Sequence, residues 1–232
     1  MVVLATKIYV EGDARQRALD SLRSLVDNDI GDLEVEFDLG IRHDDFPSVT
    51  IEGEDAVVAR NVLREEWGEI VPDLEAGETY VGTLERWDED GFVLDAGTAV
   101  RIPTDQLGLG PGSPAQIRER FGLVQHLPIE FVYGGADGDT DDGEDAPSRL
   151  SDAERDHLFE WSRGDGRLNV NSATRAEVRA TLNRAGHAQD YVTVERLGLL
   201  EQSVICTDDT DPPGLLASIG SYLPAELRCV VP

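Results

Sequence analysis

The sequence contains no long apolar run and almost no cysteine. No stretch approaches the roughly 18 consecutive apolar residues that a transmembrane helix needs, so we expect no membrane contact. Residues 1–10 lack the basic start and the small-residue cleavage site of a signal peptide, and they are predicted to form a strand. Cys206 and Cys229 are the only cysteines, too few for a disulfide framework, and both are expected to be buried free thiols. These absences predict a cytoplasmic protein.

Basic residues are scarce, and lysine is nearly absent. The 232 residues include 20 basic and 47 acidic side chains, which gives a net charge of −27 at pH 7. Lys7 is the only lysine, and every other cation is an arginine, which is more weakly hydrated and pairs well with carboxylates. At molar salt the Debye length falls to about 3 Å, which screens the repulsion within so acidic a chain. Disorder is the alternative, but 40% of the residues are hydrophobic and they recur periodically, so we predict a folded, halophilic protein.

Residues 1–72 show the pattern of a small α+β domain. The spacing of apolar residues predicts a strand over residues 2–10, a helix from Ala14 to Val26, two strands between residues 33 and 51, and a helix from about Asp55 to Trp67. The resulting order β-α-β-β-α predicts a two-layer sandwich.

Short strands separated by glycine turns occupy residues 73–135. The predicted strands are Tyr80–Trp87, Phe92–Asp95, Ala99–Ile102 and Leu127–Tyr133, with a short helix before the last. Strands of this length and spacing predict a small barrel of the OB type.

The segment that follows is acidic and contains no large apolar residue. Residues 134–148, with the sequence GGADGDTDDGEDAPS, contain six acids and no base. We assign residues 136–150 as an acidic flexible linker. A calcium loop is the alternative interpretation of Asp137, Asp139 and Asp141, but the glycine and final glutamate of such a loop are absent at their required offsets.

Residues 151–232 predict a helix followed by a ferredoxin-like domain. Ser151 and Glu154 are spaced as a capping box at the start of the helix. The pattern beyond it has the order β-α-β-β-α-β, which is the full ferredoxin-like sequence of elements. In that fold the first strand lies between the third and the fourth, which would keep Cys206 and Cys229 apart. The whole chain is therefore predicted to be an α+β protein.

Catalytic and metal-binding motifs do not occur. The four histidines lie in different predicted elements without metal-ligand spacing, and neither cysteine has a C-x-x-C partner. No nucleophile elbow, P-loop or dinucleotide fingerprint is present. Gly108–Ser113 precedes a short helix and is an alternative anion site, but it lacks the lysine and the preceding strand of a nucleotide loop. We therefore assign no catalytic residue, no metal site and no cofactor.

The first two strands of the predicted barrel carry a more specific pattern. The runs YVGTLERW at residues 80–87 and GFVLD at residues 91–95 resemble the opening strands of an S1-type OB domain. That resemblance implies RNA binding, with Phe92 stacking on a base and Trp87 and Arg101 beside it. The third strand departs from the usual S1 sequence pattern, and the domain contains 11 acidic and 4 basic residues. The alternative that Phe92 and Trp87 belong to the core stays open.

Arginines gather in one part of this acidic chain. Between residues 163 and 184 there are five arginines and two acids. The five are Arg163, Arg167, Arg175, Arg179 and Arg184. Arg175 and Arg179 are four residues apart, so they share a flank of their predicted helix. Contact with phosphates is one explanation, and pairing with the acidic linker is the other.

Two runs near the C-terminus carry a resemblance that covers nearly the whole chain. The runs ERLGLLEQSVIC at residues 195–206 and DPPGLLASIG at residues 211–220 resemble domain-of-unknown-function family 2110. The resemblance implies a haloarchaeal source and supplies no activity. The order of S1-like barrel, helix and ferredoxin-like domain is also similar to that of the alpha subunit of archaeal initiation factor two.

These observations lead to a ranked functional hypothesis. We expect a non-enzymatic protein that binds RNA or a ribonucleoprotein, associated with the ribosome or with translation. A protein–protein scaffold or regulator that contacts a protein partner and no nucleic acid is the alternative. An enzyme of unknown type is the third interpretation.

Overall fold

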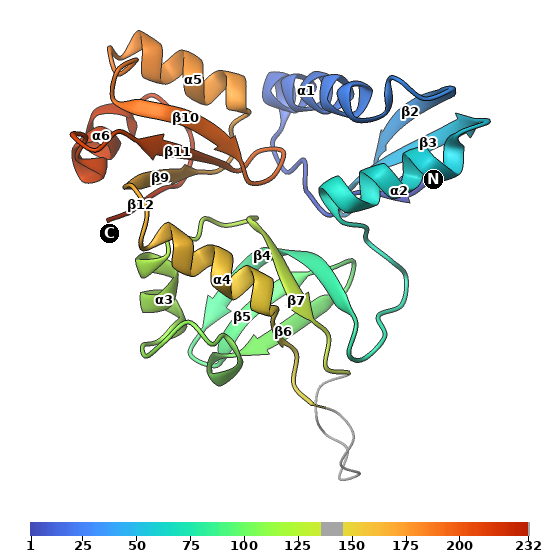
Figure 1. Ribbon diagram of the computed structural model, residues 1–232, viewed down its shortest axis with the longest axis horizontal. Coiled ribbons are helices and arrows are strands. Elements are labelled where there is room, and N and C mark those ends of the chain that lie inside the picture. The colour runs from blue at the N-terminus through green and yellow to red at the C-terminus, as the bar shows by residue number, and fades with distance from the viewer. Residues whose placement is uncertain (136–145, 232) are drawn as a thin grey trace.

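The computed structural model describes residues 1–135 and 146–231, and they form three units, each built on its own antiparallel sheet (Figure 1). The predicted α+β fold is confirmed. The N-terminal and C-terminal units lie side by side, and the central unit packs beneath both of them. The part of the predicted linker at residues 136–145 lies outside the described residues. None of the helices in the described chain has the length and apolar character needed to cross a membrane.

The N-terminal unit has the predicted β-α-β-β-α order. Its elements are β1 (Val2–Val3), α1 (Gly12–Ile30), β2 (Val35–Ile41), β3 (Pro47–Gly53) and α2 (Ala56–Trp67). The strands pair in the order β1-β3-β2. Helix α1 buries Leu22 and Val26, and α2 buries Leu63, in a core shared with the inner face of the sheet.

The first strand is much shorter than the predicted strand over residues 2–10. Only Val2 and Val3 pair with β3. The side chains of Thr6, Lys7 and Tyr9 instead contact the other two units, with partners 193, 88 and 192 residues away in sequence. Apolar alternation reports local geometry alone, so the prediction extended the strand through a segment whose polar contacts are long-range.

The central unit is built on a curled sheet. Its elements are β4 (Thr79–Asp88), β5 (Gly91–Asp95), β6 (Ala99–Pro103), η1 (Thr104–Gln106), α3 (Pro114–Arg120), β7 (Pro128–Val132), β8 (Arg149–Leu150) and α4 (Asp152–Trp161). The strands pair in the order β6-β5-β4-β7-β8 and form a half-barrel. Leu158 and Trp161 of α4 are buried in the core of this sheet. A register shift between Leu84 and Arg86 marks a bulge at Glu85.

The C-terminal unit has the predicted ferredoxin-like arrangement. Its elements are β9 (Arg167–Val170), α5 (Arg175–Arg184), β10 (Tyr191–Arg196), β11 (Gln202–Cys206), α6 (Pro212–Ile219) and β12 (Leu227–Val230). The strand order is β10-β11-β9-β12, so β9 separates the two cysteine-bearing strands as predicted. Both cysteines are free thiols; Cys206 is buried and Cys229 is half-buried. Helices α5 and α6 pack on one face of the sheet through Val178, Leu182 and Leu215.

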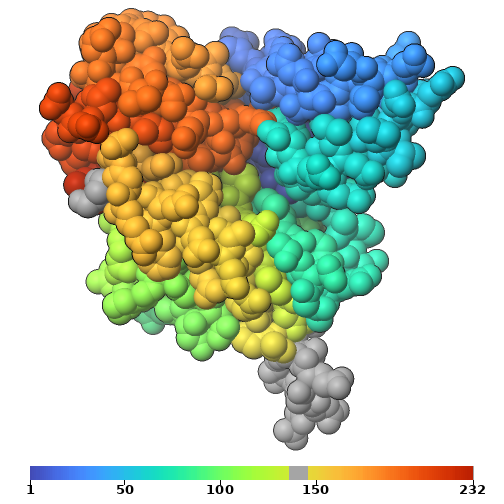
Figure 2. Space-filling model, viewed as in Figure 1, coloured from blue at the N-terminus to red at the C-terminus, as the bar shows by residue number. Residues whose placement is uncertain are grey.

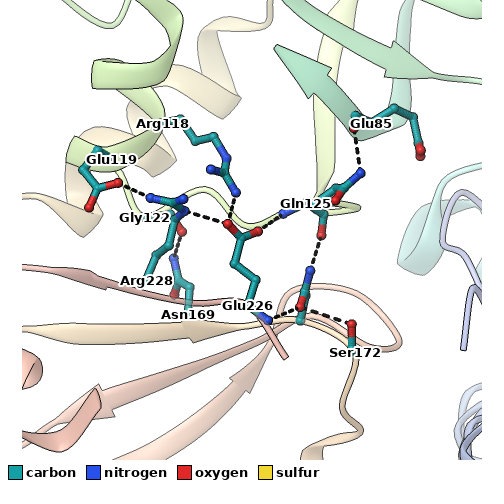
Figure 3. Close-up of polar contacts among 10 residues, drawn as sticks. Glu85, Arg118, Glu119, Gly122, Gln125, Asn169, Ser172, Glu226 and Arg228 are labelled. Atoms are coloured by element: carbon teal, nitrogen blue, oxygen red, sulfur yellow. Dashed lines mark hydrogen bonds and ion pairs between the residues drawn. The ribbon is translucent and has the colours of Figure 1, made fainter. Parts of the chain in front are cut away.

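The other face of the C-terminal sheet packs against the central unit. Figure 3 shows Glu226, just before β12, between Arg118 of α3 and Arg228 of β12. The backbone N–H of Gln125 donates to the Glu226 carboxylate at 2.9 Å, and the Asn169 amide donates to the Gly122 carbonyl at 2.9 Å. The sheet face that an RRM domain uses to stack bases is therefore occupied by protein in this chain.

Candidate nucleic-acid interface

The residues predicted from the S1-like pattern do not form a base-stacking surface. Phe92 is fully buried in the core of the central unit, so it has no face available to a base. Trp87 is half-buried, and the Arg118 guanidinium carbon lies 3.5 Å from its ring centroid. Arg101 donates to both carboxylate oxygens of Asp88, at 2.7 and 2.9 Å. The strand pattern was correct, but curling of the sheet turns Phe92 inward, and strand spacing alone does not fix which face becomes the core.

Two of the five clustered arginines have structural contacts. The Arg167 side chain is 12% exposed and donates to Glu195 at 3.5 Å and to Ser203 at 3.3 Å. The Arg163 side chain is exposed and lies over the ring of Phe159, with its guanidinium carbon 5.7 Å from the centroid. We therefore place Arg167 outside the candidate interface and keep Arg163 as a peripheral member.

The other three arginines lie on α5 and are exposed. Arg175, Arg179 and Arg184 form no ion pair with any residue that the structure describes. Most other basic side chains do pair with acids, including Arg15, Arg17, Arg23, Arg42, Arg64, Arg149, Arg155, Arg196 and Arg228. Three basic side chains without an acidic partner among the described residues therefore lie on this one helix, in a chain with a net charge of −27.

The sequence of α5 explains both its stability and its exposed charge. Thr174 and Glu177 form a reciprocal capping box at its start, which satisfies two backbone N–H groups. The helix buries Val178 and Leu182 against the sheet. Its only acid, Glu177, accepts a hydrogen bond from Arg17 of α1 at 2.6 Å. The Glu177 carboxylate is thus paired with an arginine of α1, and it does not neutralise the arginines of α5.

Helical spacing arranges these arginines on both sides of a flat strip. Arg175 and Arg179 share one flank, and Arg184 lies on the opposite side. Between them, at helical spacing, lie three small or polar exposed residues, Ala176, Ala180 and Asn183. We call this outward side of α5, with its three arginines, the α5 surface. Figure 2 shows the helix on the outside of the molecule, next to α1.

A groove with an exposed aromatic ring borders the α5 surface. It has a volume of about 280 Å³ and lies between α1, α5 and the turn after α6, with Arg17, Arg184 and Tyr222 on its wall. Tyr222 is 65% exposed. Sequence reasoning missed this residue, because a tyrosine directly after an apolar helix has the pattern of a core residue. Arginine forks bind phosphate oxygens and an exposed ring can stack on a base, so the two together can hold a nucleotide strand.

A separate polar cluster joins the three units. The ammonium group of Lys7 lies 2.7 Å from Asp95 and 2.9 Å from Glu85. His126 contacts Glu85 at 3.2 Å and stacks on Tyr9, with ring centroids 3.9 Å apart. The Tyr9 hydroxyl donates to Glu201 at 2.7 Å and accepts a hydrogen bond from the backbone N–H of Ser172. These groups are bonded mainly to one another, so we interpret the cluster as a connection between units.

Models of one protein family match almost the whole chain. The DUF2110 N-terminal domain matches residues 1–73, the DUF2110 central domain matches residues 74–162, and the DUF2110 C-terminal domain matches residues 165–231. None of the curated proteins compared with the chain matches it.

Proposed function

The chain belongs to the DUF2110 family along nearly its full length, and from that premise we propose that it is a non-enzymatic protein that binds single-stranded RNA through the α5 surface. The observation that carries the proposal is the set of three exposed arginines without an acidic partner in the described chain. Surrounding acids attract any cation, so arginines left available in this background favour an anionic partner. The proposal places the protein in the cytoplasm of a halophilic archaeon.

Single-stranded RNA suits the α5 surface better than a duplex does. Arg175, Arg179 and Arg184 lie along both sides of one short helix, which is enough for about three phosphates. Tyr222 borders the same surface, and its ring can stack only on a base that is not enclosed in a helix. The half-barrel has no part in this binding mode, because Phe92 is buried and Trp87 is covered by Arg118.

Replacing Arg175, Arg179 and Arg184 together with alanine is expected to weaken RNA binding about ten- to a hundredfold. For three phosphate contacts to a single strand, the logarithm of the binding constant should fall with the logarithm of salt concentration with a slope of about −2. The variant should lose most of that slope, because it releases few counterions. Fluorescence anisotropy with a labelled single-stranded RNA over a series of salt concentrations measures both quantities.

The matched control for the arginine variant is Arg60→Ala with Arg86→Ala. Both residues are exposed and neither pairs with an acid among the described residues, but they lie on α2 and β4. This control should keep the wild-type affinity and slope. If the α5 variant binds RNA as the wild type does, or if the wild type binds none, the proposal is wrong.

Replacing Tyr222 with alanine is expected to weaken RNA binding about tenfold without changing the salt slope. Stacking of one base on an aromatic ring contributes about 1 to 3 kcal/mol and involves no counterion release. Tyr222→Phe keeps the ring and should bind as the wild type does. A salt slope that falls with Tyr222→Ala would contradict a stacking role, and the same anisotropy series measures it.

A further inference from the structure

Outside the α5 surface, the described residues enclose a cavity where the three units meet. It has a volume of about 320 Å³. The first residues of the chain, α2, β7, α4 and the end of β10 all contribute to its wall, with Thr6, Trp67, Glu130, Glu154 and Arg196 among them. Cavities of this size between domains are common places for small ligands.

A second groove adjoins the cavity. It has a volume of about 560 Å³ and lies between α2 and the edge of β4. The two share Glu65, Gly68, Val81 and Glu130 as wall residues. We call the pair the junction groove. The combined space is larger than a single ion requires, and Val81 and Gly68 lie where the cavity and the groove adjoin.

Carboxylates outnumber cations along the junction groove. Its two arginines are already paired, Arg196 with Glu66 and Arg64 with Glu69. The remaining acids of the wall have no basic partner among the described residues; they are Glu65, Glu78, Glu130 and Glu154. Glu65 and Glu78 are exposed, whereas Glu130 on β7 and Glu154 on α4 are partly buried.

Glu154 does not make the contact that its sequence position predicts. Ser151 caps the backbone N–H of Glu154 as expected, but the Glu154 carboxylate accepts from the backbone N–H of Glu130 at 3.1 Å and does not return to Ser151. Its other oxygen has no partner within the described chain. Burial raises the pKa of Glu154 to about 7; the hydrogen bond from Glu130 opposes this rise, and the Glu130 carboxylate adds to it. The wall therefore contains two adjacent carboxyl groups that a bound cation would stabilise.

The residues that line the groove favour an organic cation over a metal ion. Among the described residues, no group of three or more histidine, cysteine or acidic side chains could hold a metal. Apolar side chains, including Val81, Leu127 and Leu197, line the cavity together with the carboxylates. We propose that the junction groove binds a linear aliphatic polyamine, with one ammonium group held by Glu130 and Glu154 and the alkyl chain lying over Val81 toward Glu78.

The test is calorimetric titration of the full chain with spermidine in molar potassium chloride, where weak surface binding is screened. We expect saturable binding at one site. Glu130→Gln and Glu154→Gln should each weaken it about tenfold or more, because each removes a charge-assisted hydrogen bond. Glu160→Gln is the matched control, since it lies on the same helix α4, is exposed and does not contribute to the cavity wall, and it should bind as the wild type does.

Two further experiments test the kind of ligand and the role of Glu154. Magnesium chloride in place of spermidine should give no saturable binding at the groove; binding as tight as that of spermidine would overturn the assignment to an organic cation. Spermidine affinity should rise as pH increases through about 7, because a cation favours the ionised form of Glu154. The other titratable or charged groups of the cavity wall are Glu65 and Glu66 on α2, Glu130 on β7, Arg196 on β10 and His157 on α4 itself. Absence of saturable spermidine binding, or equal binding by all three glutamine variants, overturns the proposal.

Discussion

Replacing Lys7 with methionine is expected to lower the free energy of unfolding by about 3 to 5 kcal/mol, the usual cost of removing one partner of a buried ion pair. Lys7 is 7% exposed, and among the described residues it is the one basic side chain that pairs with both Asp95 and Glu85. Methionine has a similar volume and fits beside the ring of Phe46, which lies 4.9 Å from the ammonium group. The loss therefore comes from two carboxylates that lose the ammonium group between them.

The state of Glu85 makes this loss large near neutral pH. Burial would raise the pKa of Glu85, but hydrogen bonds with His126 and Lys7 outweigh burial and lower the pKa to about 2. A carboxyl group with a lowered folded-state pKa contributes stability above its unfolded pKa, and that contribution is lost as pH falls from 4.5 toward 2. Removing Lys7 takes away part of this contribution. The wild type and the variant should therefore differ most above about pH 5 and converge in acid.

The control for Lys7→Met removes the two negative charges as well as the positive one. In the triple variant Lys7→Met, Glu85→Gln, Asp95→Asn, both carboxylates become neutral amides that need no cation, so most of the lost stability should return. Urea unfolding in molar salt, followed by circular dichroism, measures all three proteins. If Lys7→Met alone unfolds at the wild-type midpoint, the cluster has no stabilising role.

The sequence predicted the local elements better than the contacts between units. The order of strands and helices in the C-terminal unit follows from apolar periodicity, and so does the separation of Cys206 from Cys229. The segment after Val3 was predicted as strand because its apolar residues alternate. Its true role depends on Lys7 and Tyr9, whose partners lie in other units. Such contacts leave no periodic signal.

The candidate interface was predicted in part. The excess of arginine near α5 is visible in the sequence because charge of one sign stands out against the opposite background. Which arginines remain available is a tertiary property: Arg167 is bonded to Glu195, whereas Arg175 is exposed. For Phe92, the sequence pattern correctly predicted a strand, but it did not show which face of the curled sheet becomes the core.

The single lysine illustrates why composition and structure must be considered together. Of the 20 basic residues, 19 are arginines and only Lys7 is a lysine. A compact ammonium group can lie between two carboxylates and a phenyl ring, where a planar guanidinium would need more space. The exception to the composition therefore lies at the junction of the three units, where Tyr9, two residues further on, donates to the buried Glu201.

Replacing Glu201 with glutamine is expected to stabilise the fold on the order of 3 to 5 kcal/mol above pH 8 and to change little in acid. Glu201 is fully buried, and only one of its oxygens has a hydrogen-bond partner among the described residues, the hydroxyl of Tyr9. The close approach of the other oxygen depends on Gly198, because a Cβ atom there would lie 2.3 Å from it. Burial raises the pKa of Glu201 from 4.5 to about 8, against the opposing effect of the Tyr9 hydrogen bond.

The sign of the pH dependence follows from that raised pKa. Between pH 4.5 and 8 the folded protein keeps a proton on Glu201 that the unfolded chain has lost, so stability falls as pH rises through this window and then levels off. Glutamine cannot ionise and keeps an oxygen for Tyr9, so the variant should lose this part of the alkaline decline. Glu154, with a pKa near 7, contributes a separate decline that the variant retains. Urea unfolding over a pH series measures both profiles, with Glu52→Gln, an exposed change on β3, as the control. If the wild type and Glu201→Gln run parallel across the whole series, Glu201 is already ionised in the fold and its carboxylate must have a counter-charge that its present partners do not supply.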